Sequence, residues 1–166
     1  MFNNITAFCG SRNLPSKYSN IISKIVQSVI DDGHDIVVGC ADGADKMVRT
    51  AAPNATVLYA SDYGHSKSSF ARRSQAVVKT ATIGMIGFTD KPCPNGIVPA
   101  SSWRSGKPTS GTWSSLALAA GFDLTVTVYW CSDDDVDLPN WPSGQWTNIA
   151  KNGWCWSPTV QHSLFS

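Results

Sequence analysis

The sequence has little charge and lacks the patterns of membrane and secreted proteins. Charged residues make up 15% of its 166 residues and the formal net charge is +1. No whole-protein field therefore draws it onto nucleic acid or an anionic membrane. No apolar run approaches the roughly 18 residues of a membrane helix. The first ten residues have no basic segment before an apolar stretch, so we expect a strand there, not a signal peptide. We expect a cytoplasmic protein with neither a membrane nor a nucleic-acid partner.

Cysteine, histidine and nucleotide-loop patterns are also missing. The five cysteines include no C-x-x-C pair, and their odd number argues against a disulfide framework. A zinc site is not indicated either, and a reducing cytosol fits best. His34, His65 and His162 show no metal spacing, so we expect no metal and no cofactor. The chain contains no Walker loop, no G-x-G-x-x-G fingerprint and no G-x-S-x-G elbow.

Hydrophobic periodicity predicts the fold class. Apolar residues from Tyr18 to Ile30 recur at helical spacing, and Gly33 suits a left-handed helix end. Short apolar runs alternate with helical segments along the chain, which predicts right-handed crossovers and a parallel sheet. The fold class is α/β, a Rossmann-like, mainly parallel sheet of about five strands with helices on both faces. The predicted strands are 5–9, 35–38, 56–59, 83–88 and 124–130, and the predicted helices are 15–32, 44–52, 70–80 and 111–120.

Two segments do not follow this alternation. The connection 89–110 is rich in Pro, Gly and Ser and is longer than compact domains usually keep without a functional reason. From Cys131 onward an acidic run precedes four tryptophans set among Pro, Gly and Asn, with no helical period. We therefore divide the chain into a nucleotide-binding domain, 1–130, and an irregular Trp-rich extension, 131–166. The extension packs on the domain, covers a ligand at the sheet edge or meets another subunit, and these are alternatives.

The loop after the first strand is the first of four candidate phosphate-binding elements. Ligands of parallel α/β sheets bind outside the carboxyl ends of the strands, where these loops gather. Gly10 allows the backbone to approach a phosphate, and amides at a helix start point toward it. Ser11 adds a hydroxyl, and Arg12 could hold a phosphate or carboxylate with two hydrogen bonds. An ordinary tight turn is the alternative.

The loop after the second strand has two glycines followed by a carboxylate. Gly39 and Gly43 suit a loop that wraps a ribose phosphate, and Asp45 could accept from a ribose hydroxyl or an exocyclic amine. Asp in a first helical turn is also good capping chemistry, which is the alternative for Asp45. Asp42, within the loop, is assigned to binding or to the turn itself.

The third and fourth elements lie farther along the chain. Arg72 and Arg73 are adjacent on a predicted helix, so about 100° separates them and one at most faces a given site. A solvated basic face is the alternative for this pair. Ser110, Gly111 and Thr112 open a helix after the long connection and offer amides and a hydroxyl to an anion. Thr112 could equally cap that helix.

Taken in chain order, these loops resemble the LOG superfamily. This group of Rossmann-like proteins includes the LONELY GUY phosphoribohydrolases, the DNA-processing protein A core and the SLOG nucleotide-sensing domains. Phe8 to Ser11 with Tyr18 is similar to the family's F-C-G-S…Y element, and 39–45 to its second glycine loop. Arg72/Arg73 lies where the family has a helix arginine, and 110–112 where it has P-G-G-x-G-T-x-x-E. The likeness covers about residues 4–130.

The departures from that pattern shape the expected function. Ser115 occupies the position of the family's catalytic glutamate, so the resemblance implies a binding cradle without its hydrolytic carboxylate. Ser61 to His65 looks like the small stand-alone bacterial and phage branch of SLOG proteins. We expect a protein of a bacterial cell, host- or phage-encoded, that binds a nucleotide-derived small molecule without hydrolysis. The expected ligand is an ADP-ribose derivative or a cyclic nucleotide signal, and the protein would act in antiviral signalling as a sensor of that ligand or as a protein that sequesters it.

Two other functions are kept as alternatives. The first is a phosphoribohydrolase that cleaves the N-glycosidic bond of a nucleoside monophosphate, with Arg73 on the phosphate and Asp45 as the surviving carboxylate. The second is single-stranded DNA binding, as in the DNA-processing protein, with tryptophans stacking on bases. The low net charge argues against the second. A homo-oligomer is expected, because relatives pair beside the site and the Trp-rich extension is a large apolar load.

Overall fold

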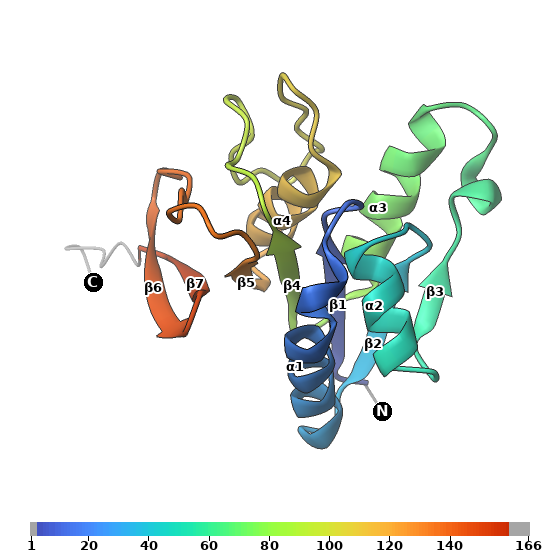
Figure 1. Cartoon of the computed structure of the whole chain (residues 1–166). Coiled ribbons are helices and arrows are strands. Elements are labelled where there is room, and N and C mark those ends of the chain that lie inside the picture. The colour runs from blue at the N-terminus through green and yellow to red at the C-terminus, as the bar shows by residue number, and fades with distance from the viewer. Residues whose placement is uncertain (1–2, 160–166) are drawn as a thin grey trace, which may run out of the picture.

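The computed structural model describes residues 3–159 and has one seven-stranded sheet in the order β3-β2-β1-β4-β5-β7-β6 (Figure 1). Five strands run parallel: β1 (Ile5–Gly10), β2 (Asp35–Gly39), β3 (Thr56–Leu58), β4 (Gly84–Thr89) and β5 (Thr125–Trp130). The last two, β6 (Gly144–Ala150) and β7 (Gly153–Pro158), form an antiparallel hairpin whose β7 pairs with β5.

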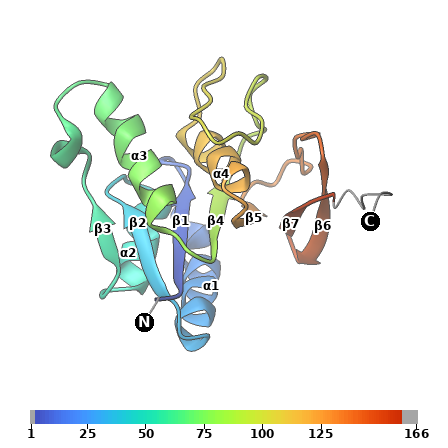
Figure 2. The same cartoon turned by 180° about the vertical axis from the view of Figure 1, so that it is seen from behind.

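Helices cover both faces of the sheet. Figure 1 shows α1 (Ser19–Asp31) and α2 (Ala44–Ala51) in front of the parallel strands, whereas α3 (Ser68–Thr80) and α4 (Gly111–Gly121) cover the other face in Figure 2. Short 3-10 helices, η1 (Ser16–Tyr18) and η2 (Ala60–Tyr63), precede α1 and α3. The predicted α/β class with a mainly parallel sheet is confirmed. No helix among residues 3–159 is long and apolar enough to cross a membrane.

The sheet is larger than the five strands expected, because the Trp-rich extension is not irregular throughout. Its β6–β7 hairpin turns at Lys151 and Asn152, where Asn152 has a φ of 59° and Gly153 follows. Asn-Gly between two runs containing aromatic residues is a strong hairpin signal. Trp146 and Trp156 are direct cross-strand partners, so the hairpin buries apolar surface as it adds to the sheet. Residues 160–166 of the predicted extension lie outside the described residues.

The face under α1 and α2 is built on an amphipathic helix. Ile22, Val26 and Val29 are the buried stripe of α1, and burial of each such side chain contributes roughly 1.5–3 kcal/mol. They pack in one cluster with Phe8 and Phe88, whose rings stack with centroids 6.1 Å apart. Helix α1 therefore presses on β1 and β4, the two strands whose carboxyl ends carry the site.

The opposite face is dominated by tryptophan. The Trp113 ring of α4 meets the rings of Trp141 and Trp146 edge-on, at centroid distances of 5.9 and 6.4 Å. Trp113 Nε1 donates to the Lys91 carbonyl at 2.9 Å, and Trp141 Nε1 donates to the Ile97 carbonyl at 3.0 Å. The extension thus packs on α4, and the tryptophans anchor the long connection between β4 and α4.

Strand order places a topological switch between β1 and β4. From β1 the chain proceeds to β2 and β3 on one side, and from β4 to β5 on the other. The loops after β1 and β4 therefore separate at their carboxyl ends and leave a crevice, which is where open parallel sheets bind ligands.

Candidate functional site

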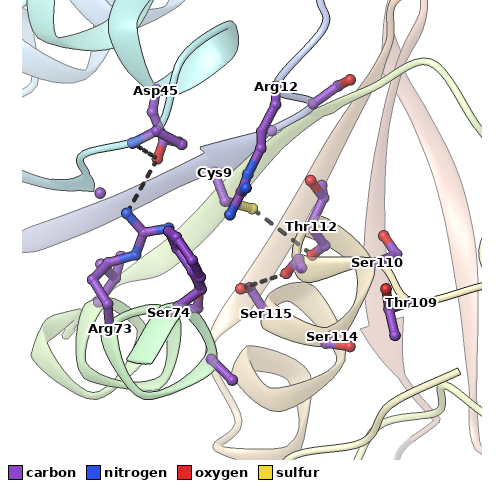
Figure 3. Close-up of a pocket in the computed structure, with 18 of the residues that line it drawn as sticks. Cys9, Arg12, Asp45, Arg73, Ser74, Thr109, Ser110, Thr112, Ser114 and Ser115 are labelled. Atoms are coloured by element: carbon purple, nitrogen blue, oxygen red, sulfur yellow. Dashed lines mark hydrogen bonds and ion pairs between the residues drawn. The ribbon is translucent and has the colours of Figure 1, made fainter. Parts of the chain in front are cut away.

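A cavity of about 570 Å³ opens at this switch point. Its walls come from the loops after β1, β2 and β4, from one side of α3 and from the N-terminal half of α4 (Figure 3). Most of the residues selected from the sequence line it: Gly10, Ser11, Arg12, Gly39, Asp45, Arg73, Ser110, Gly111 and Thr112. The four loops chosen for their glycines and arginines thus meet in one place.

Three of the selected residues do not line the cavity. Gly43 has a φ of +68°, and its missing side chain lets the second loop lie against the first, where the Ala44 amide donates to the Ser11 carbonyl at 3.0 Å. Arg72 Nη1 donates to the Tyr63 carbonyl at 3.2 Å and so braces the loop before α3. Asp42 lies in the second loop outside the cavity wall.

The loop after β1 directs Arg12 into the cavity. The Ser11 amide donates to the Phe88 carbonyl at 2.9 Å, which fixes the turn against β4. Gly10 is needed for this approach, because a Cβ there would lie 2.7 Å from the same carbonyl oxygen. The Arg12 guanidinium then lies 4.8 Å from the centroid of the Phe70 ring, a cation–π contact at the start of α3. Arg12 is exposed and free to meet an anion.

A buried ion pair forms the cavity floor. Arg73 Nη1 lies 4.0 Å from Asp45 Oδ2, and the two side chains are only 6% and 8% exposed. Asp45 Oδ2 also accepts from the Ala41 amide at 3.3 Å, and Arg73 Nη1 contacts Cys40 Sγ at 3.1 Å. Gly39 makes this possible, because a Cβ there would lie 2.7 Å from Asp45 Oδ2. The carboxylate braces its own loop and Arg73, and Gly43 holds the N-cap position of α2.

Burial changes the acidity of two groups in the floor. Desolvation raises the pKa of Asp45 to about 6, although the positive charge of Arg73 opposes this shift. Burial, reinforced by the negative charge of Asp45, raises the pKa of the Cys9 thiol well above its usual range. Cys9 is therefore a neutral thiol at pH 7, whereas the Asp45 carboxyl releases its proton at a higher pH than an ordinary aspartate.

The wall formed by α4 carries hydroxyls in place of charges. Ser110 caps the helix, since its Oγ accepts from the Trp113 amide at 3.2 Å. Ser115, where the LOG family has its catalytic glutamate, is 2% exposed and donates to the Gly111 carbonyl at 2.7 Å. The whole chain contains no glutamate. Asp45, the carboxylate considered as a substitute, is held against Arg73.

Further lining residues were not selected from the sequence. Those with charged or aromatic side chains near the opening include Lys67 and Phe70 at the start of α3, and Asp90, Lys91 and Trp103 on the connection between β4 and α4. For Asp90, Lys91 and Trp103, the sequence offered only the unusual length of the connection between β4 and α4, and that length does not indicate which of its residues line a site. Lys67 and Phe70 adjoin the arginine pair on α3 and could have been included with it.

The cavity combines positive charge with aromatic surface. Four cationic side chains line it, against the two carboxylates of Asp45 and Asp90. Arg12, Lys67 and Lys91 are exposed, and Phe70 is 45% exposed. Within residues 3–159, no three His, Cys, Asp or Glu side chains gather where they could hold a metal ion, and His162 lies outside that range. The arrangement suits an anionic ligand that carries flat rings.

Comparisons with known proteins give one informative likeness. No family model and no curated protein sequence matches the chain. A solved structure of DNA processing protein A from Helicobacter pylori matches the chain with a TM-score of 0.60. That structure was determined to explain how DNA processing protein A binds single-stranded DNA. The sequences are 18% identical, and the match covers 80% of this chain and 68% of that one. The part of the LOG resemblance that concerns the DNA-processing protein A fold is thereby confirmed.

The comparison corrects two expectations from the sequence. The protein of like fold binds single-stranded DNA, which contradicts a nucleotide-derived small molecule as ligand and the exclusion of a nucleic-acid partner. The exclusion rested on a net charge of +1, but that sum hides where the charges lie. Arg12, Lys67 and Lys91 converge on one cavity of a chain whose fold is that of DNA processing protein A.

Proposed function

We propose that this protein binds single-stranded DNA at the cavity between β1 and β4. The observation that carries the proposal is the convergence of exposed cations and aromatic rings on the switch-point cavity of a DNA-processing-protein fold. Proteins that bind single strands combine a positive groove for the backbone with rings on which bases stack. The ordered glycine loops also support membership of the LOG superfamily, in the branch that includes the DNA-processing protein A core.

The backbone phosphates are assigned to the rim and to the start of α4. Arg12 and Lys67 flank the opening from two different elements, so both can reach phosphates of one strand. The first amides of a helix have no partner within it and favour negative charge. In α4 these are the amides of Gly111 and Thr112, because the Ser110 cap uses the next one, that of Trp113. Rim and helix together form the anion seat.

The bases are assigned to Phe70 and Trp103. Both rings line the cavity, and the Arg12 guanidinium lies over one face of the Phe70 ring, so a base would stack on the other face or displace Arg12. A base must leave its stack to reach them, which costs least for a single strand and is opposed by pairing in a duplex. The arrangement therefore favours single strands, with little dependence on base identity, because every base has a π face.

Titration of a fluorescein-labelled oligothymidine, followed by fluorescence anisotropy over a range of salt concentrations, tests the proposal. We expect binding at low salt that weakens steeply as salt rises, with a hairpin duplex of equal length binding more weakly. Lys67→Ala should weaken binding and reduce the slope of log affinity against log salt by about 0.7, the value for one phosphate contact on a single strand.

The matched control lies on the same helix. Lys79 is exposed in the last turn of α3, at the end away from the cavity, so Lys79→Ala should leave both affinity and salt slope unchanged. Equal effects of the two substitutions would show that binding is diffuse. Equal affinity for duplex and single strand, or no binding at low salt, would overturn the proposal.

A further inference from the structure

We propose that Asp45 is a charge-regulating positioning residue, which holds Arg73 in the cavity floor and cancels its charge until Asp45 takes up a proton. The inference rests on the proposed function, because the ligand whose affinity it controls is the DNA backbone. Protonation would leave the Arg73 guanidinium unbalanced at the floor, and the cavity would then hold phosphate more tightly.

The geometry makes the two side chains a unit within the cavity. Asp45 belongs to α2 and Arg73 to α3, on opposite faces of the sheet, and both reach the cavity past the end of β2 (Figure 3). Their 4.0 Å approach is almost fully screened from solvent. Gly39, at the end of β2, leaves the space in which they meet. Arg73 cannot approach a phosphate at the floor without the Asp45 carboxyl beside it.

The groups around Asp45 leave Arg73 as its main electrostatic partner. On α2, Arg49 Nη1 donates to the carbonyls of Gly39 and Ala41, both at 2.8 Å, so its charge is directed at the loop backbone. Arg12 acts on Asp45 from the β1 loop more weakly than Arg49 or Arg73, and the neutral Cys9 thiol faces it from β1. The Cys40 thiol lies on the Arg73 side. No other ion pair to Asp45 occurs among the described residues.

The consequence for ligand binding has a definite sign. Burial raises the pKa of Asp45 to about 6, so at pH 7.5 the carboxyl is ionised and the pair is neutral. An incoming phosphate then meets a carboxylate that repels it and a guanidinium already paired. At pH 5 the carboxyl is neutral, the repulsion is gone and Arg73 carries an unshared charge. Both changes strengthen phosphate binding as pH falls.

The test is the affinity for labelled oligothymidine between pH 5 and pH 8 at constant ionic strength. We expect the wild type to bind on the order of tenfold more tightly at pH 5 than at pH 7.5. An affinity change of that size corresponds to a rise of about one unit in the pKa of Asp45 when DNA binds. Asp45→Asn, close in shape and without the charge, should bind tightly at every pH and show no break near pH 6.

Two control variants separate Asp45 from other titrating groups. Asp90→Asn removes the second carboxylate of the cavity and should retain the break, because Asp90 has no arginine paired to it in the described chain. His65→Gln should also retain it. His65 is exposed on the loop before α3 and does not line the cavity.

A second measurement uses the wild type alone. Calorimetric titration with the same oligonucleotide at pH 6.5, in buffers of different ionisation enthalpy, should reveal proton uptake on binding that the Asp45→Asn variant lacks. If binding neither depends on pH nor takes up a proton, the inference is overturned and the proposed function is left intact. A break that persists in Asp45→Asn would do the same, whereas absence of DNA binding at every pH would overturn both.

Discussion

The two walls of the cavity are built on different principles. The first wall, which includes the floor, comes from the loops after β1 and β2 and from α2 and α3, and it carries the charged groups of Arg12, Asp45 and Arg73. There an ion pair joins Asp45 to Arg73, and Asp45 accepts a hydrogen bond from the loop backbone. The wall from α4 carries only hydroxyls and amides, and tryptophans behind it hold it in place. One wall therefore sets the charge of the site, while the other supplies neutral donors at positions fixed by apolar packing.

This difference means that the walls should respond to different perturbations. Coulombic interactions within the first wall depend on pH and salt, because protons and ions change them directly. Packing behind the second wall depends on the volume and shape of buried rings, and removal of such a ring leaves a cavity that destabilises the protein. Three substitutions separate the two responses, in order of decreasing effect.

Trp113→Ala should be the most destabilising, because Trp113 is 1% exposed, touches two other tryptophans and holds Lys91 through its Nε1. Truncation of a buried Trp costs about 3–5 kcal/mol, measurable as a fall in the free energy of unfolding in urea. Trp154→Ala is the matched control, since Trp154 is only half-buried, and its loss should be clearly smaller. Equal losses would mean that α4 does not depend on the tryptophans behind it.

The second prediction concerns the pH dependence of stability. The pKa of Asp45 is about 6 in the folded protein, against its usual 3.8. At a pH between these two pKa values, Asp45 keeps its proton in the folded protein but has released it in the unfolded chain. The contribution of Asp45 to the stability of the folded protein is therefore fully present below about pH 4. That contribution, roughly 3 kcal/mol, is lost as pH rises through 6.

Urea unfolding of wild type and Asp45→Asn at several pH values between 4 and 7 measures this contribution as a difference. The wild type should lose stability relative to the variant as pH rises over that range. Parallel curves for the two proteins would show that Asp45 is as acidic in the folded state as in the unfolded chain.

The smallest effect is expected at the mouth of the α4 wall. Ser110→Ala removes the side chain that accepts from the Trp113 amide, and loss of such a cap costs about 1 kcal/mol. Thermal unfolding measures the change, and Ser110→Asn, which can also cap, should restore most of it. A failure of Asn to restore stability would mean that the cap does not account for the loss.

Local patterns were sufficient to predict the parallel half of the fold. The stripe that includes Ile22, Val26 and Val29 predicts α1, and Gly33, at a φ of 83°, ends it as expected. The hairpin was missed because tryptophans set among Pro and Gly show neither helical nor strict strand alternation. Asn152-Gly153 was its available signal. Membership of the sheet depended on pairing with β5, a long-range contact that no local pattern encodes.

The site was predictable at the level of loops and less so at the level of roles. Glycine after a strand predicts close backbone approach, and Gly10 and Gly39 do lie at the cavity. The pairing of Asp45 with Arg73 was not predictable, because it joins residues from opposite faces of the sheet. The net charge of the whole chain also misled the prediction about a nucleic-acid partner, because it does not show where the charges lie in the fold. The acidic run, 133–137, lies outside the cavity, whereas three exposed cations line it.

The distribution of tryptophan has an optical consequence. Of the seven tryptophans, Trp103 lines the cavity, while Trp113, Trp130, Trp141 and Trp156 are buried in the core. Shielded indoles emit at shorter wavelengths than solvated ones, so excitation of the protein yields a constant blue background from the interior. Because Trp103 is the tryptophan that lines the cavity, we expect a base that stacks there to change mainly the emission of Trp103. The chain thus carries an intrinsic reporter of occupancy, which the difference spectrum between wild type and Trp103→Phe isolates.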